Sequence, residues 1–357
     1  MSRPARPTIR DVARAAGVSK GLVSFALNGR PGVADETRER ILTAARALGW
    51  EPSHRARALS ASRAFAVGLV IARPPELLGA DPFYPAFIAG VERTLTDRGL
   101  ALVLQVVPES AEETSYRRLA ADGRVDGVFL LDLRVADPRL ALLEGLGLPA
   151  VTIARPDTPT RWPALLIDDR PGIAAAVAHL AALGHRRIAH VAGPDHYLHG
   201  RSRRQAWERA LTDAGLPADR CVESDFSAAG GAQATRALLE AAERPTAIVY
   251  ANDLMAIAGL AVARERGLDV PAQLSVTGFD DAELAGYVSP PLTTVRTDPF
   301  EWGRAAALAL LRLIDGEPVA DVPTPPAPLV VRASTAPPPA PPARRRRPPP
   351  PSRSERP

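Results

Sequence analysis

The 357-residue sequence contains one cysteine and one lysine, and each scarcity excludes a set of functions. Cys221 has no second cysteine with which to form an intrachain disulfide or the thiolate cluster of a structural zinc site. Because Lys20 is the only lysine, no other position can supply the amine of a Walker-type phosphate site, a Schiff base or a kinase-type nucleotide site. A group of enzyme classes is excluded on these grounds.

Long apolar runs are also missing. The longest, such as residues 64–72, fall far short of the roughly 18 residues that a membrane helix needs. Residues 1–6 are basic but lack the apolar stretch and small-residue cleavage site of a secretory signal. Hydrophobic residues still make up 46% of the chain and charged residues 24%, which suits two or three packed units. We therefore expect a cytoplasmic protein with no membrane association.

Basic charge is concentrated at the two ends of the chain. Residues 1–63 hold 12 Lys and Arg against 5 Asp and Glu, and residues 336–357 hold 6 against 1. The two ends together carry +12, and since the whole chain carries +4, residues 64–335 carry −8. Clustered Arg and Lys attract duplex DNA because they release its counterions, so the ends are candidate DNA contacts. Charge alone fits equally well with arginines that only solvate a surface.

The C-terminal segment 336–357 contains ten prolines in 22 residues and an arginine run at 344–347. Such a composition buries too little apolar surface to offset the entropy lost on ordering. The sequence therefore predicts a disordered Pro/Arg-rich tail, either simply solvated or weakly attracted to DNA.

Residues 1–51 predict three short helices around a small core. Thr8 and Asp11 have the spacing of a capping box, and Ser19 can cap a second helix after a glycine turn. A third helix is expected at about residues 35–48. Two short helices joined by such a turn, with basic and hydroxyl side chains outside, are typical of a helix-turn-helix whose second helix enters the major groove. A three-helix bundle used for protein contact is the alternative.

Residues 17–21 also match the G-x-S-x-G pattern of a hydrolase nucleophile elbow. That elbow requires a buried strand before the serine, whereas an amphipathic helix is predicted before Ser19. We therefore predict that Ser19 caps a helix and is not a nucleophile.

The same segment closely resembles the head of LacI-type (lactose-repressor-like) transcriptional regulators. The match is ungapped over residues 8–19 and continues at residues 23–24, 27–28, 37–38 and 50–52. The resemblance implies that Lys20, Gly21 and Phe25 read DNA bases. Together with hydroxyl groups and helix ends that can reach phosphates, the expected DNA contacts of the head are Thr8, Ser19, Lys20, Gly21, Leu22, Ser24, Phe25 and Asn28.

Two of these positions depart from the family pattern. Leu22 stands where the family usually has Thr, and Phe25 where it usually has Arg. A bidentate Arg–guanine contact is worth about 1–3 kcal/mol of discrimination, whereas Phe25 offers only apolar contact, for instance to a thymine methyl group. The operator should therefore differ from the commonest family sites. Ala34 stands where a capping Ser is frequent, so Asp35 is expected to begin the third helix.

Residues 52–63 form a short, basic, helix-capable segment that is too short to be stable alone. The resemblance implies a hinge helix that forms on DNA as a pair in the minor groove and inserts a leucine between base steps, as minor-groove wedges do. Arg55, Ala56 and Leu59 are the expected DNA contacts there. An ordinary linker is the alternative.

Residues 64–335 alternate apolar strand-like runs with helical segments, which indicates parallel sheets covered by helices. The expected fold is thus an all-α helix-turn-helix head followed by an α/β body of two Rossmann-like parallel-sheet lobes. The resemblance extends to about residue 335 and implies the periplasmic-binding-protein-like type I arrangement, with effector binding and dimerisation in this body. Ligands of such sheets bind beyond the carboxyl ends of the strands.

Polar and aromatic residues gather at those predicted strand ends, namely Phe83, Tyr84, Arg203, Trp207, Phe226, Asn252 and Asp280. Arg, Asn and Asp side chains form directed hydrogen bonds and aromatic faces stack on ring surfaces, which suits a small polyhydroxylated or heterocyclic ligand. The resemblance implies that Arg203, Asn252 and Asp280 hold an effector. It also implies that the cleft is lined by Phe83, Tyr84, Trp207 and Phe226. Ala154, Arg155 and Ala206 depart from the family pattern and leave the identity of the effector open.

Other polar residues carry weaker signals. His190, His196 and His199 have no paired carboxylate or thiolate in the sequence pattern, so we expect no metal and no cofactor. His185 precedes a predicted strand and is expected at the surface or as a cap. Asp168 and Asp169 are adjacent at a strand end and should point in opposite directions.

Together these features predict a dimeric, effector-responsive, DNA-binding regulator, a repressor without catalytic activity. Its expected partners are a pseudo-palindromic double-stranded DNA operator, a small carbohydrate-like or nucleoside-like effector and a second copy of the chain. A periplasmic-type sugar receptor is one alternative, although it would need an export signal and no DNA-binding head. A DNA-architectural protein with a vestigial cleft is the other.

Overall fold

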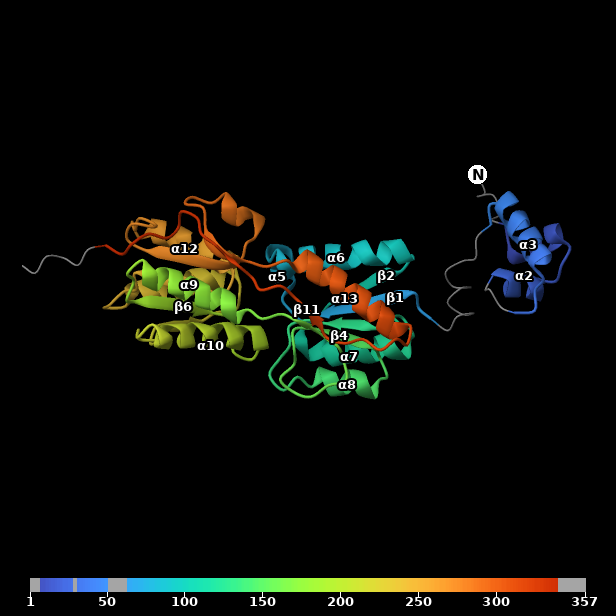
Figure 1. Cartoon of the computed structure of the whole chain (residues 1–357), viewed down its shortest axis with the longest axis horizontal. Coiled ribbons are helices and arrows are strands. Elements are labelled where there is room, and N and C mark those ends of the chain that lie inside the picture. The colour runs from blue at the N-terminus through green and yellow to red at the C-terminus, as the bar shows by residue number, and fades with distance from the viewer. Residues whose placement is uncertain (1–6, 28–30, 51–62, 340–357) are drawn as a thin grey trace, which may run out of the picture.

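The computed structural model describes residues 7–27, 31–50 and 63–339 (Figure 1). The first two ranges hold the predicted helices α1 (Ile9–Ala16), α2 (Lys20–Leu27) and α3 (Asp35–Ala47). Their shared core contains Val12, Val23 and Ile41, each fully buried. The predicted trihelical head is therefore confirmed.

The helix boundaries of the head follow the predicted signals. The Thr8 backbone N–H donates to Asp11 Oδ2 at 2.9 Å, which is half of the capping box. Gly17 ends α1 with φ +65°, and the Leu22 N–H donates to Ser19 Oγ at 3.2 Å at the start of α2. Ser19 thus lies in the turn between two helices, which is not the strand-to-helix geometry of a nucleophile elbow. Helix α3 begins at Asp35 without a side-chain cap from Ala34.

The body contains two six-stranded sheets. In the first lobe all pairs are parallel, and the strand order is β11 (Val322–Pro323), β5 (Ala164–Leu166), β4 (Ala150–Ile153), β3 (Val128–Leu130), β1 (Ala66–Ile71), β2 (Ala101–Val106). In the second lobe the order is β12 (Leu329–Val330), β10 (Thr293–Arg296), β9 (Ser275–Asp280), β8 (Ala247–Tyr250), β6 (Ile188–Ala192), β7 (Cys221–Glu223). Only the edge strand β12 runs antiparallel to its neighbour. The predicted parallel-sheet lobes are confirmed.

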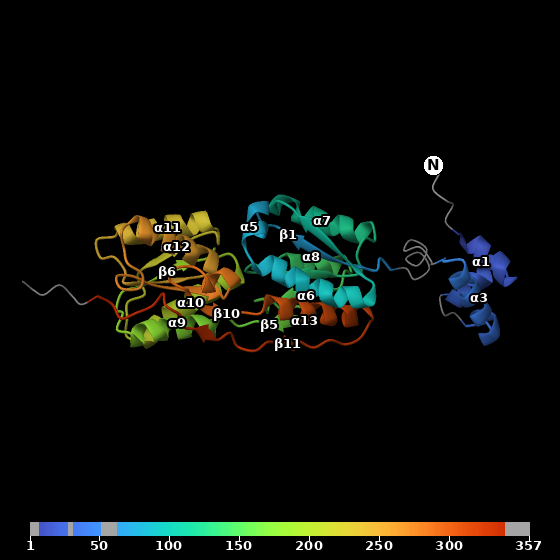
Figure 2. The same cartoon turned by 90° about the horizontal axis from the view of Figure 1, so that it is seen from above.

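Helices cover both faces of each sheet, as Figures 1 and 2 show. The first lobe carries α5 (Pro75–Ala80), α6 (Phe83–Arg98), α7 (Glu109–Ala121), α8 (Arg139–Gly145) and α13 (Pro299–Ile314). The second carries α9 (Arg170–Ala182), α10 (Leu198–Asp213), α11 (Ala228–Glu240), α12 (Asp253–Glu265) and the 3₁₀ turn η1 (Glu283–Gly286). A separate apolar cluster lies on each side of each sheet, so each lobe has its own core.

The chain passes between the lobes three times, at residues 167–169, 297–298 and 324–328. Hydrogen bonds join these crossings to one another. Thr324 Oγ1 donates to the Leu166 carbonyl at 2.9 Å, and the Arg296 N–H donates to the Pro328 carbonyl at 2.8 Å. Because the three crossings are adjacent, they form a hinge on one side of the gap between the lobes.

Helices α6 and α13 pack with their backbones in contact. A Cβ on Gly90 would collide with the Phe300 carbonyl oxygen, and one on Gly303 would collide with the Phe87 carbonyl oxygen. Glycine at both positions therefore allows this close approach. It brings the first turns of the two helices together, where the Phe83 and Trp302 rings lie 6.4 Å apart.

The expectation for His185 is wrong, because the side chain is 1% exposed. Nδ1 contacts Thr246 Oγ1 at 2.9 Å, and Nε2 contacts Ser275 Oγ at 3.0 Å and the Ala336 carbonyl at 2.9 Å. Burial lowers the pKa of His185. The imidazole thus anchors the C-terminal segment to the second lobe. The packed body therefore includes Ala336, the first residue of the predicted tail, while residues 340–357 lie outside the described part of the chain.

Candidate functional site

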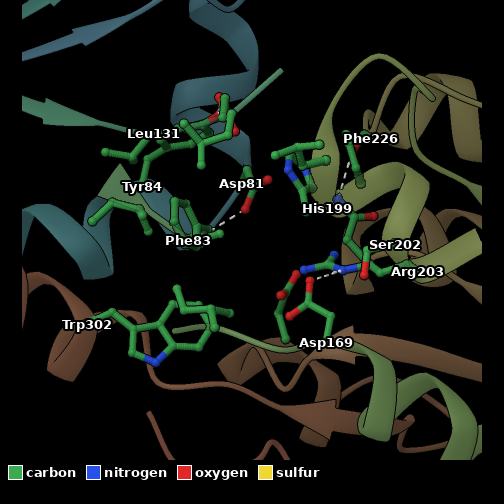
Figure 3. A pocket seen from close by; sticks show the side chains of 18 of the residues that line it. Asp81, Phe83, Tyr84, Leu131, Asp169, His199, Ser202, Arg203, Phe226 and Trp302 are labelled. Carbon is green, nitrogen blue, oxygen red and sulfur yellow. Dashed lines mark hydrogen bonds and ion pairs between the residues drawn. The ribbon is translucent and has the colours of Figure 1, made fainter. Parts of the chain in front are cut away.

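A cavity of about 280 Å³, called the inner cavity below, lies between the two lobes (Figure 3). The first lobe contributes Phe83, Tyr84 and Leu131, and the second lobe contributes His199, Arg203 and Phe226 from the opposite side. Residues 167–169 of the first hinge crossing and Arg170, the first residue of α9, also line it. The cavity therefore lies at the carboxyl ends of the strands, where doubly wound sheets bind ligands.

Six of the seven residues predicted to contact an effector line this cavity: Phe83, Tyr84, Arg203, Phe226, Asn252 and Asp280. The structure does not place the seventh, Trp207, at the cavity. Trp207 is fully buried in the core of the second lobe, stacked on His190 with ring centroids 5.6 Å apart. Arg203 and Trp207 share a face of α10 but are separated by about one turn, roughly 5.4 Å. Arg203, nearer the start of the helix, therefore reaches the cavity, whereas Trp207 packs on the sheet.

Arg203 is held from several sides. Nε donates to Asp169 Oδ2 at 2.8 Å, and a terminal nitrogen donates to the Ala251 carbonyl at 2.5 Å. The guanidinium carbon also lies 3.8 Å from the centroid of the Phe279 ring. Burial by itself would lower the pKa of Arg203, but Asp169 and Asp280 raise it overall, so the side chain stays charged.

Arg73 forms the corresponding pair in the first lobe. Nε donates to Asp132 Oδ2 at 2.9 Å, and the Tyr84 hydroxyl donates to the same oxygen at 2.8 Å. Burial alone would raise the pKa of Asp132, but the Arg73 charge and these hydrogen bonds lower it overall. The Arg73 guanidinium reaches across to the second lobe, where it lies 3.7 Å from the centroid of the Tyr197 ring.

The other two cavity arginines are also paired. Arg170 forms an ion pair with Asp168 at 2.7 Å, and Arg155 forms one with Asp321. Asp168 and its neighbour Asp169 have different partners, although both line the inner cavity. Each arginine that lines the inner cavity is therefore already neutralised by an aspartate.

Two cavity carboxyls, Asp81 and Asp280, form no ion pair with the residues that the structure describes. Asp81 Oδ1 accepts a hydrogen bond from the Phe83 N–H at 3.0 Å, while the Asp280 carboxyl accepts none from the described residues. Burial raises the pKa of Asp81, and it raises the pKa of Asp280 well above its usual range. The cavity therefore presents hydrogen-bonding carboxyl groups that the protein itself leaves unpaired.

The Asp280 loop is positioned by the residues that begin α12. Asp253 accepts hydrogen bonds from the Ala282 N–H at 2.8 Å and from Thr294 Oγ1 at 2.5 Å. Asn252 Oδ1 caps α12 by accepting from the Met255 N–H at 2.9 Å, and its Nδ2 donates to the Phe226 carbonyl at 3.0 Å. Asn252 is thus occupied in fixing the wall of the cavity.

Asp253 should make stability depend on pH, because burial raises its pKa to about 7. A carboxyl with a raised folded-state pKa contributes stability that is complete below its unfolded value, near 3.9, and is lost as the pH rises through 7. We expect Asp253→Asn to remove a pH-dependent loss on the order of 2 kcal/mol between pH 5 and pH 8. Its melting temperature should fall less than that of the wild type over this interval; parallel pH profiles would contradict the assignment.

Sequence reasoning missed several residues of the site: Arg73, Asp81, Asp132, His199 and Trp302. Arg73 and Asp132 lie just beyond the ends of β1 and β3, so the strand-end rule could have found them. Trp302 arrives on α13, and no local signal connects it to the cavity. The His199 ring stacks on Phe226 with centroids 5.1 Å apart.

His199 is a neutral group in this setting, because burial lowers its pKa to about 3. His190 is buried in the second lobe, where Nδ1 lies 2.8 Å from the Val249 carbonyl. Within residues 7–27, 31–50 and 63–339, no group of three or more His, Cys, Asp or Glu side chains is arranged to hold a metal ion.

Among the predicted DNA-contacting residues of the head that the structure describes, Thr8 caps the start of α1 and the others lie at the turn and on α2. Thr8, Ser19, Lys20 and Gly21 are exposed, Leu22 and Ser24 are half-buried, and Phe25 is 43% exposed. Asn28, Arg55, Ala56 and Leu59 lie outside the described residues. The outward side of α2 thus carries the side chains predicted to read bases, while Val23 and Ala26 face the core.

A helix-turn-helix head followed by a two-lobed body with a ligand-sized cleft is the architecture of a DNA-binding regulator. Residues 8–53 match the family described as bacterial regulatory proteins, lacI family, and residues 177–335 match the periplasmic binding protein-like domain. The chain belongs to the LacI family and is a DNA-binding transcriptional regulator, not an enzyme. Among the described helices, none is both long and apolar enough to cross a membrane.

Relatives match nearly the whole chain. An uncharacterized HTH-type transcriptional regulator in the aml 5' region of Streptomyces limosus is 41% identical, over 93% of this chain and 95% of its own length. The HTH-type transcriptional regulator CelR of Thermobifida fusca is 37% identical, over 89% of this chain and 94% of its own. These relatives set aside the alternative of a periplasmic sugar receptor, since they are transcriptional regulators.

Two solved structures show the same fold over the head and the body. A CelR–cellobiose complex is 35% identical and superposes with a TM-score of 0.72, covering 92% of this chain and all (100%) of that one. The lac repressor dimer bound to operator and the anti-inducer ONPF is 30% identical with a TM-score of 0.79, covering 93% of this chain and 100% of that one.

Proposed function

We propose that this regulator is a cytoplasmic homodimeric repressor whose affinity for a pseudo-palindromic operator is controlled by a small neutral sugar in the inner cavity. For this function we divide the chain into a DNA-binding head at residues 1–51, a predicted hinge helix at 52–63, most of which lies outside the described residues, and an effector-binding and dimerisation body from residue 64 that includes the packed Ala336 and is followed by the predicted tail. CelR, a relative over almost the entire chain, is found in complex with cellobiose, and the related lac repressor is a dimer on its operator.

The pairing of charges in the inner cavity carries the proposal. All four arginines there form ion pairs with aspartates, whereas Asp81 and Asp280 form no ion pair with the described residues. A phosphate or carboxylate ligand would need an unpaired cation and would approach two carboxyls. A neutral sugar offers hydroxyl donors to those carboxyls and an apolar ring face to nearby aromatic rings. The geometry therefore favours a sugar over a nucleotide or a sugar phosphate.

Control of DNA binding would follow from contacts that depend on how the lobes are arranged. Away from the hinge, the Leu198 N–H donates to the Leu133 carbonyl at 2.8 Å, and the Val135 N–H donates to the His196 carbonyl at 3.0 Å. A ligand that touches both lobes can shift the equilibrium only by its differential affinity for the two arrangements. We expect a coupling free energy of about 1–3 kcal/mol between effector and operator.

The test is a ligand panel applied to the full-length protein while its melting temperature is measured. Neutral mono- and disaccharides, nucleosides and sugar phosphates form the three arms. A neutral sugar at 100 times its Kd should stabilise the protein by about 2.7 kcal/mol, and its phosphorylated counterpart should not. Stabilisation by phosphorylated sugars alone would contradict the pairing argument, and no shift with any compound would favour an architectural protein.

DNA binding is measured on the same material, with an operator selected from random duplexes. The neutral sugar that raises the melting temperature should change operator affinity about 5- to 150-fold. Two chains per operator are expected from a twofold-symmetric complex, and titration gives this stoichiometry directly.

A further inference from the structure

A second cavity, called the outer cavity below, lies between the lobes and has a volume of about 680 Å³. Its walls come from α5 and the β2–α7 connection of the first lobe, and from the loops before α10 and α11 of the second. No residue of the three hinge crossings lines it. It is therefore on the side of the interlobe gap away from the hinge, whereas the inner cavity is next to the hinge.

The two cavities share part of their walls, namely Arg73 and Leu77. Arg73 is tied to Asp132 on the inner side, and its guanidinium lies over Tyr197, which lines the outer cavity. The same guanidinium lies 5.7 Å from the centroid of Phe226, which lines the inner cavity. A ligand that extends past Arg73 would therefore pass from the Phe226 ring of the inner cavity to the Tyr197 ring of the outer cavity.

Like the inner cavity, the outer cavity is lined by carboxyl groups and by an arginine that is already paired with an aspartate. Three carboxylates line it: Glu76, Glu109, which forms an ion pair with Arg134, and Asp225, which accepts hydrogen bonds from Ser227. Its one arginine, Arg73, is already paired with Asp132. Prolines and the Tyr197 ring provide apolar faces, and the His196 ring lies 4.1 Å from that of Tyr197. These walls suit a ligand with hydroxyl donors, a flat apolar face and no negative charge.

The size of the inner cavity adds a reason for a longer ligand. At about 280 Å³ it corresponds to the lower end of the range of roughly 300–1,000 Å³ that is usual for small-molecule sites. A ligand that filled only the inner cavity would leave the larger neighbouring space between the lobes unused.

We propose that the outer cavity is an extension subsite and that the effector is a neutral oligosaccharide. One terminal sugar unit occupies the inner cavity, and the next unit or units pass Arg73 into the outer cavity. This inference rests on the proposed sugar response of the inner cavity and specifies the length and charge of the ligand.

The test compares ligand length in variants that fill the outer cavity. Ala80, at the end of α5, is exposed and lines only the outer cavity, so Ala80→Trp should block it. Its matched control is Gly79→Trp, the same bulk one residue earlier, at an exposed position that lines neither cavity and has open space around its Cβ direction. Ala228→Trp fills the outer cavity from the second lobe and serves if Ala80→Trp folds poorly.

Affinities are measured by isothermal titration with glucose, xylose and galactose and with their di- and trisaccharides. In the wild type and in Gly79→Trp, the best di- or trisaccharide should bind at least tenfold more tightly than its monosaccharide. Ala80→Trp and Ala228→Trp should lose this gain and keep monosaccharide affinity within twofold. An oligosaccharide with a uronic acid at its outer unit should bind at least tenfold more weakly than the neutral one.

Different results would contradict the extension subsite and the sugar response of the inner cavity. Monosaccharide binding that does not strengthen with length, or a length-dependent gain that survives both tryptophan variants, would overturn the extension subsite and leave the sugar response intact. Absence of binding by every sugar would overturn both the sugar response and the subsite.

Discussion

At a pH above the raised pKa of Asp280, Asp280→Asn is expected to weaken binding of the sugar effector by about 10- to 150-fold, because it removes a charged acceptor that forms no ion pair within the described protein. Each hydrogen bond to a charged group contributes about 1.5–3 kcal/mol, which corresponds to that range of affinity. The Asp280 carboxyl accepts no hydrogen bond from the described residues and lines the inner cavity. Isothermal titration with the sugar that stabilises the wild type measures the loss.

The pH dependence of binding separates this role from a structural one. Burial raises the pKa of Asp280 well above its usual range, and only the ionised form accepts hydrogen bonds with both oxygens. Effector affinity in the wild type should therefore decrease as the pH falls through this pKa. The Asn variant has no such ionisation, so its weaker affinity should be nearly independent of pH.

A matched control is Asp168→Asn, which makes the same change at a cavity carboxyl already paired with Arg170. Its effect on effector affinity should stay below about threefold, since exposed pairs contribute little. Operator affinity without effector should be unchanged in both variants. Wild-type effector affinity in Asp280→Asn would remove Asp280 from the site, and a parallel loss of operator binding would indicate misfolding.

Phe25→Arg is expected to change which operator the protein selects. Phe25 is 43% exposed on α2, the helix predicted to enter the major groove, and can offer bases only an apolar surface. Arg at this position can bind guanine through two hydrogen bonds, worth about 1–3 kcal/mol, or about 5- to 150-fold in preference. Selection of bound sequences from random duplex DNA, done with both proteins at one salt concentration, measures the change.

Phe25→Ala is the control, because it removes the ring without adding a donor. It should weaken discrimination at the contacted base pair and create no preference for guanine there. Since added positive charge strengthens binding to any DNA, the ratio of selected to scrambled sequence is the quantity to compare. An unchanged selected sequence in Phe25→Arg would mean that Phe25 does not face the bases.

The head was predictable because its signals are local. The Thr8–Asp11 capping box, the left-handed Gly17 and the Ser19 cap each act within four residues, and each lies where it was expected. The apolar spacing likewise predicted the shared core that contains Val12 and Ile41. Tertiary contacts were not needed to locate these helices.

The cleft was only partly predictable. Parallel strands end at the same edge of a sheet, so the rule that ligands bind there placed Arg203, Asn252 and Asp280 together. The rule says nothing of how far along a helix a side chain still reaches the edge, and it therefore included Trp207, which the structure buries one turn away. It also says nothing of His185, whose burial depends on the C-terminal segment that packs against it.

By itself, the sequence determined the helical head, the two parallel-sheet lobes and most residues that line the inner cavity, because periodicity, caps and strand ends are properties of short segments. Only the tertiary structure decided which charges neutralise one another, since Arg73 meets Asp132 and Arg203 meets Asp169 across many intervening residues. It alone also revealed the outer cavity, because that space exists only where two separately folded lobes face each other. Ion pairing and cavity shape depend on distances between segments remote in the chain, and no local pattern encodes those distances.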